Sequence, residues 1–247
     1  MQLDIFNDGR DVQLRNDLAD ALACDDADAA RAAAAALQAA FPRDDTLPPA
    51  QALIDALDLR QAPAFASHDD LAAARGAMTA SIAPAATRVL GAGASPWLAL
   101  RWGEMASGAV GLPFDAVRSE DHAAPLWLRA SRWAEAAAAI ERIESWRRKP
   151  VPLGWMAQAR YHLQGLDSTW TLLAELAWMS CERLDVVLRS LDDPLLRRLR
   201  DGFEERFNDG VPTRRPNRRC GWWWSCSGWS GRAGSARSCK SARSCER

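Results

Sequence analysis

The chain has 247 residues and a formal net charge of −1, but its charge is unevenly distributed. Residues 211–247 carry nine lysines or arginines and one acid, whereas the rest of the chain holds 22 basic and 31 acidic residues. An acidic body argues against a nucleic-acid-binding domain, and no apolar run approaches the ~18 residues of a membrane span. The start "MQLDIFNDGRD" lacks signal-peptide features, and the body has cysteine only at Cys24 and Cys181, so we expect a cytoplasmic protein without a disulfide framework.

The first half of the chain is predicted to form helices separated by turns. Residues 2–6 are a candidate extended stretch, and the spacing of Leu14, Leu18 and Leu22 predicts a helix over 12–23. Further helices are expected after Asp26 up to Phe41, over 50–59, over 67–78 and over 96–110. The expected N-caps are Asp25 or Asp26, Ser67 with Asp70 in a capping box, and Ser95 before Pro96. A loop is expected over 111–121.

The second half is predicted to be more densely helical. Helices are expected over 124–130, 132–146, 152–164, 168–179, 181–191 and 194–207. Ser131 provides a turn, Gly165 a stop, and Asp167 and Asp193 the caps of the helices that follow them. Because runs rich in Val, Ile and Thr are absent, the predicted fold class is all-α, with short helices packed as antiparallel pairs.

Two stretches resemble the tetratricopeptide repeat. In "LRASRWAEAAAAIERI", Ser131 stands at the small turn position, Trp133 at the aromatic position and Ala136 at the small packing position, followed by Ile140 and Ile143. The stretch "ALACDDADAARAAAAALQAAFP" is similar and has a proline, Pro42, at the closing position. The resemblance implies that residues 1–210 form an array of helical hairpins (a TPR-like α-solenoid), with a possible sub-division near 111–121, and that they bind a protein or peptide.

Motifs with chemical function are absent from the sequence. Ser67 and Asp70 explain the acids beside His68 as helix capping, and neither His122 nor His162 has a partner at metal-ligand spacing. "GAGASP" lacks the third glycine and the preceding strand of a dinucleotide loop, so a turn between helices is expected there. We therefore assign no catalytic, cofactor-binding or metal-binding residues, and expect no cofactor and no small-molecule substrate.

Eight tryptophans occur before residue 211, which allows two interpretations. They could line an aromatic groove for a peptide, or they could pack between alanine-rich helices, which we expect for Trp133, Trp170 and Trp178. Trp146 differs, because it precedes Arg147, Arg148 and Lys149 at a predicted helix end. These basic residues suit the negative end of a helix dipole, and they are also the candidate contact site for an acidic partner.

The C-terminal segment 211–247 is rich in Trp, Cys, Arg and Ser. A nucleic-acid-binding arm, a cysteine metal site and an ordinary disordered tail are three interpretations. The fourth is a displaced reading frame: Trp222 to Trp224 must be encoded TGGTGGTGG, which gives Val-Val when shifted by two nucleotides. We favour this last interpretation and expect 211–247 not to form a folded domain.

The sequence thus predicts a protein–protein interaction or scaffold module of bacterial type. Its mechanism would be a concave surface of tryptophans and arginines formed by stacked helix pairs. Two alternatives stay open: an enzyme or enzyme subunit with a helical site around His122 or His162, and nucleic-acid binding through 211–247. A protein or peptide is the expected partner; a membrane or a nucleic acid is not.

Overall fold

A computed structural model describes residues 5–58 and 64–207 of the chain, with side chains from Gly9 to Gly202 within these ranges. The regular secondary structure of this part of the chain is all helical, with no strand, which confirms the predicted all-α fold class. In the same part, no helix combines the length and the hydropathy that crossing a bilayer requires. The predictions made for residues 211–247 lie outside the described residues.

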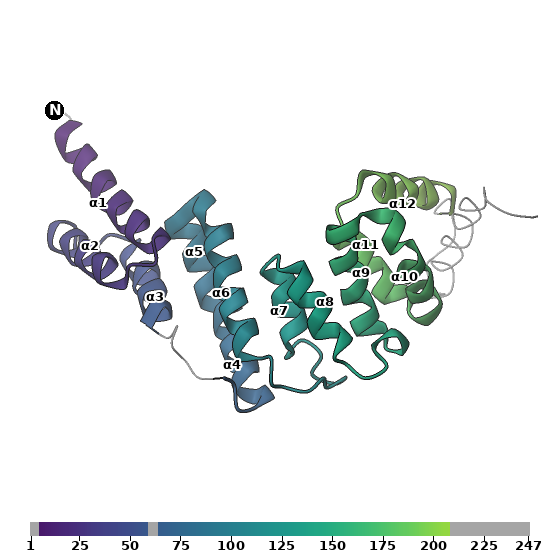
Figure 1. Cartoon of the computed structure of the whole chain (residues 1–247). Helices are drawn as coiled ribbons and strands as arrows, with labels where there is room; N and C mark the ends of the chain where they lie inside the picture. The colour runs from purple at the N-terminus through teal and green to yellow at the C-terminus, as the bar shows by residue number, and fades with distance from the viewer. Residues whose placement is uncertain (1–4, 59–63, 208–247) are drawn as a thin grey trace, which may run out of the picture.

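The helices follow one another along an arc, from α1 at the purple end to α12 at the yellow-green end (Figure 1). They are α1 (Ile5–Ala23), α2 (Ala27–Ala40), α3 (Leu47–Asp58), α4 (His68–Ala77), α5 (Ala83–Leu90), α6 (Ala94–Gly108), α7 (Ala123–Arg129), α8 (Trp133–Glu141), α9 (Pro150–Gln164), α10 (Leu166–Met179), α11 (Cys181–Ser190) and α12 (Pro194–Phe207). Short segments of other helical types are η2 (Met78–Ile82), η3 (Gly91–Gly93) and η4 (Trp146–Arg148).

Side-chain caps fix several helix starts, and most are those predicted. Asp26 accepts the Ala29 amide at 2.9 Å, Ser67 accepts the Asp70 amide at 3.2 Å, and Asp193 accepts the Leu195 amide at 2.8 Å. Each bond satisfies an amide that has no partner within its helix. The caps predicted at Ser95 and Asp167 are wrong, because α6 and α10 begin at Ala94 and Leu166, two residues before the predicted starts, with Gly93 and Gly165 at the cap positions.

Several helix limits differ from the prediction. Residues Ile5 and Phe6 lie in α1 and not in an extended stretch, and α8 ends at Glu141 and not at Trp146. The helix that begins at His68 does not stop at Met78 but continues through the π-helical η2 into α5. Pro84 gives the physical reason for η2. It has no N–H to donate, and its ring would clash with the carbonyl oxygen that a regular α-helix places four residues before it, so the preceding turn widens.

The core is a series of three connected clusters. The first joins α1, α2, α3, α5 and α6, the second joins α4, α6 and α7, and the third joins α7 to α12. Ile82 and Leu98 pack against both the first and the second cluster, and Trp127 packs against both the second and the third. Hydrophobic contact therefore continues along the arc, with each helix packed mainly against its neighbours in the chain.

The arc has two edges, which matter for the sites below. The α5–α6 turn and the α7–α8 turn lie on its inner, concave edge, whereas the connection from α6 to α7 (109–122) runs along the outer edge (Figure 1). Ser131 in the α7–α8 turn has a φ of 56°, in the left-handed region, which allows the sharp reversal between these helices. In the outer connection, Leu112 is buried with Ala109 and Ala123 in the second cluster.

Candidate functional site

A groove of 490 Å³ lies where α5, α6 and α7 meet, beside the α5–α6 turn. Small side chains form most of its wall, together with one leucine, one tryptophan and one arginine: Thr87, Gly91, Ala94, Ser95, Leu98, Ala99, Trp102 and Arg129. The α6 residues among them lie on one helix face over two turns, a length of about 12 Å. The groove is open and wide enough to receive side chains of another molecule.

Arg129 and Trp102 form one end of the groove. The Arg129 guanidinium carbon lies 4.9 Å from the centroid of the Trp102 ring, a cation–π contact between α7 and α6. Trp102 is 9% exposed and belongs to the second core cluster, so the ring is a fixed base for the guanidinium. Arg129 also pairs with Glu120 across 3.3 Å, and both of these side chains are more than one-third exposed.

A second arginine and tryptophan lie on the other side of the α7–α8 turn. The Arg132 guanidinium lies 6.0 Å from the centroid of the Trp127 ring, and Arg132 donates to Glu135 at 2.8 Å. The hydrogen bond from Arg132 lowers the pKa of Glu135. Arginines on both sides of one turn thus make cation–π contacts with tryptophans, and each of these arginines is also paired with a glutamate.

The stacking of Trp133 and His162 extends this surface to α9. The two rings are nearly parallel, at 12°, with centroids 3.8 Å apart, and partial burial lowers the pKa of His162. Trp133 is therefore half-buried beneath an exposed histidine and is not a full core residue. We name the surface formed by Trp102, Trp127, Trp133, Arg129 and Arg132 the Trp/Arg surface.

The other tryptophans expected in the core give a mixed result. Trp170 is partly buried against the third core cluster, in agreement with the prediction. Trp178 is 72% exposed, so the prediction of a core position is wrong for it. Trp178 lies at the end of α10, where the last turn extends past the buried Leu173, Leu176 and Ala177.

The predicted contact site at Trp146, Arg147, Arg148 and Lys149 lies in and just after η4, next to the outer connection. Trp146 packs against the third core cluster, and Arg147 donates to Glu175 at 2.7 Å, which lowers the pKa of that carboxyl. The Lys149 ammonium lies 5.2 Å from the centroid of the Phe114 ring, so it helps to hold the outer connection. Arg148 is exposed. The structure thus gives Arg147 and Lys149 intramolecular contacts, and their role in partner binding stays a prediction.

The histidines proposed for an enzyme have structural contacts. His122 is the N-cap of α7, where its Nδ1 accepts the Ala124 amide at 3.1 Å, and its ring is parallel to that of Trp155. His122 is 6% exposed, and burial, with Arg142 and His68, lowers its pKa to about 4. His68 contacts the carbonyl of Pro113. Among the described residues, no group of three His, Cys, Asp or Glu residues is arranged to hold a metal ion.

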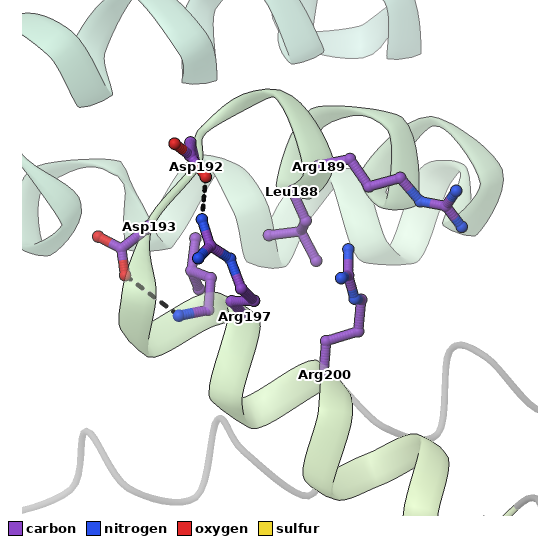
Figure 2. A pocket seen from close by; sticks show the side chains of 7 residues that line it. Leu188, Arg189, Asp192, Asp193, Arg197 and Arg200 are labelled. Atoms are coloured by element: carbon purple, nitrogen blue, oxygen red, sulfur yellow. Dashed lines mark hydrogen bonds and ion pairs between the residues drawn. The ribbon is translucent and has the colours of Figure 1, made fainter.

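A smaller pocket of 70 Å³ lies between α11 and α12 and contains three arginines. Figure 2 shows that they do not converge: Arg197 turns toward Asp192, with which it is ion-paired, while Arg189 extends away from the pocket. Arg189 pairs with Asp185 at 2.8 Å, and Arg200 lies 3.7 Å from Asp201. The guanidinium groups thus face separate carboxylates, which does not favour a common anion site.

Sequence reasoning missed the groove and the pairing of Arg129 with Trp102. The available signal was the stretch "LRASR", in which two arginines flank the predicted turn at Ser131. Comparison with protein-family models, with curated proteins and with solved structures finds no match for this chain.

Proposed function

We propose that this protein is a helical-repeat interaction module of tetratricopeptide-like architecture that binds a protein or peptide partner on the inner edge of its arc. The tetratricopeptide-like packing is supported at three positions: Ala136, Ile140 and Ile143, which are no more than 5% exposed and would be the buried positions of such a repeat. The succession of connected core clusters also supports a repeat-like array, in which each helix pair needs its neighbours. The predicted cytoplasmic location stays a prediction.

The observation that carries the proposal is the open groove beside the Trp/Arg surface. The apolar side chains of the groove, Leu98 and Trp102, would exclude water from a partner side chain, and aromatic and arginine residues are the types that dominate interface energies. Trp102 is held by the core, and the cation–π contact with Trp102 restrains Arg129, which reduces the conformational entropy that binding of a partner would cost.

The test uses the full chain as a bait for phage-displayed random dodecapeptides. Ser95 is exposed and lines the groove, so Ser95→Trp fills the groove without removing a core side chain. Ser107→Trp is the matched control, because Ser107 is an exposed serine of the same helix that does not line the groove. We expect the selected peptides to bind Ser95→Trp at least about tenfold more weakly than wild type, a loss of about 1.4 kcal/mol.

The control variant should bind these peptides as wild type does. Melting temperatures of both variants, followed by circular dichroism, check that each one is folded. Equal binding of the peptides to wild type and to folded Ser95→Trp would contradict the proposed binding face.

A further inference from the structure

We propose that the groove recognises an acidic segment of its partner, in which a side-chain carboxylate pairs with Arg129 while neighbouring aliphatic side chains occupy the groove beside Leu98 and Trp102. This inference rests on the proposed function and gives the chemistry of the partner. About four residues of an extended segment span the α6 face of the groove.

The charge of the groove selects the sign of the partner. Arg129 is the charged residue among the eight that line the groove, and its ion-pair partner Glu120 is not one of them. Arg132, 60% exposed on the other side of the turn, is paired with Glu135, so it adds no net charge nearby. Among the lining side chains, a partner carboxylate therefore finds the guanidinium of Arg129, whereas a basic segment finds no carboxylate.

Arg129 retains the capacity to bind a second carboxylate. Its contact with Glu120 joins a single nitrogen to a single oxygen across 3.3 Å, between side chains that are 38% and 42% exposed. Such a pair is weak, and a guanidinium has five N–H donors, so most of its hydrogen-bonding capacity is left for a partner. The cation–π contact with Trp102 keeps the guanidinium beside the groove, where its planar group can make a two-bonded contact with a carboxylate.

The remaining groove residues specify the rest of the segment. Gly91, Ala94, Ser95 and Ala99 leave space, while Leu98 and Trp102 provide apolar contact. Short aliphatic side chains fit this lining, because they bury apolar surface and bring no unpaired polar group. The expected ligand is therefore a mixed acidic and aliphatic sequence and not an all-acidic one.

The experiment compares peptide selection on two full-length proteins. Phage-displayed dodecapeptides are selected on wild type after counter-selection on Ser95→Trp. Residues 211–247, with their nine basic residues, are the same in both proteins, so peptides that bind there are removed. We expect the surviving peptides to be enriched in Asp and Glu together with Val, Leu and Ile.

The decisive measurement is a double comparison by fluorescence anisotropy. One selected peptide, blocked at both termini, is compared with its copy in which each Glu is Gln and each Asp is Asn. Wild type should bind the amide copy at least about tenfold more weakly, as should the control variant Arg189→Gln, which changes an exposed, ion-paired arginine of α11. Arg129→Gln should bind the two peptides with similar affinity.

Each result has a distinct meaning. If the peptides require the open groove but Arg129→Gln still prefers the carboxylate form as strongly as wild type does, the acidic-segment inference is overturned and the proposed function stands. If selection yields basic or uncharged sequences, the inference is overturned as well. If no peptide distinguishes wild type from folded Ser95→Trp, both proposals fail.

Discussion

The contact between α6 and the α1–α2 turn depends on a buried arginine. Arg101 is 3% exposed, donates to Asp25 at 2.7 Å and pairs with Glu104 at 3.1 Å. One turn earlier, the Trp97 indole donates to the carbonyl of Leu22 at 3.0 Å, and the Arg101 guanidinium lies 5.1 Å from the centroid of the Trp97 ring. We predict that Arg101→Ala is strongly destabilising.

The magnitude follows from burial. Removing one member of a buried ion pair costs about 3–5 kcal/mol, because the other member stays desolvated without compensation. The side chain of Asp25 is 18% exposed and that of Glu104 is 32% exposed, so water compensates in part and the lower end, about 3 kcal/mol, is expected. For a chain of this size, each kcal/mol corresponds to about 2–4 °C, which gives a fall in melting temperature of about 6–12 °C.

Urea unfolding followed by circular dichroism measures the effect, and Arg147→Ala is the matched control. Arg147 makes a two-bonded pair with Glu175, but its side chain is 56% exposed, so its loss should cost at most about 1 kcal/mol. The double variant Arg101→Met with Asp25→Gly should lose less free energy of unfolding than its two single variants lose in sum, since both charges are removed together. Equal costs for Arg101→Ala and Arg147→Ala would refute this reasoning.

Three further predictions concern the α7 cap, the α7–α8 turn and the C-terminal segment. The pKa of His122 is lowered from 6.5 to about 4 in the folded chain, so as the pH falls the unfolded chain binds a proton at this histidine before the folded chain does. About 3 kcal/mol of stability, present above pH 6.5, should therefore be lost as the pH falls to 4. Urea midpoints should show this loss in wild type and less of it in His122→Asn. Ser131→Gly should raise the melting temperature by about 2–4 °C in calorimetry, because the left-handed φ strains serine but not glycine. Shifting the reading frame after Gly210 should also raise the melting temperature, by about 2–4 °C for each kcal/mol gained from packed Val and Leu; an unchanged value would contradict the displaced-frame interpretation of 211–247.

Much of the fold follows from local chemistry that the sequence displays. The capping residues Asp26, Ser67 and Asp193 each precede a helix, because a side-chain oxygen satisfies a first-turn amide whatever the tertiary structure. The continuation through η2 was not predictable in this way. Pro84 indicates a helix break locally, whereas burial of Met78 and Ala85 in adjacent core clusters favours a continuous helix with one wider turn.

The candidate site was less predictable, since its residues meet only in the folded chain. Trp102 and Arg129 come from different helices, and the sequence around neither residue shows whether its side chain is buried in the core or exposed at the surface. Composition suggested a binding surface of tryptophans and arginines, which stays a prediction, and placed the candidate contact at Trp146 to Lys149. There the structure shows that contacts with Glu175 and Phe114 already occupy Arg147 and Lys149.

Two arginine–tryptophan pairs on neighbouring helices show how burial separates structural from binding chemistry. Arg101 over Trp97 and Arg129 over Trp102 have similar cation–π distances, 5.1 and 4.9 Å. Arg101 is 3% exposed and faces two carboxylates of its own chain, so its charge is compensated internally and its removal costs stability. Arg129 is 38% exposed and has one long contact at the edge of an open groove, so the same change there should cost little stability and much affinity for a carboxylate.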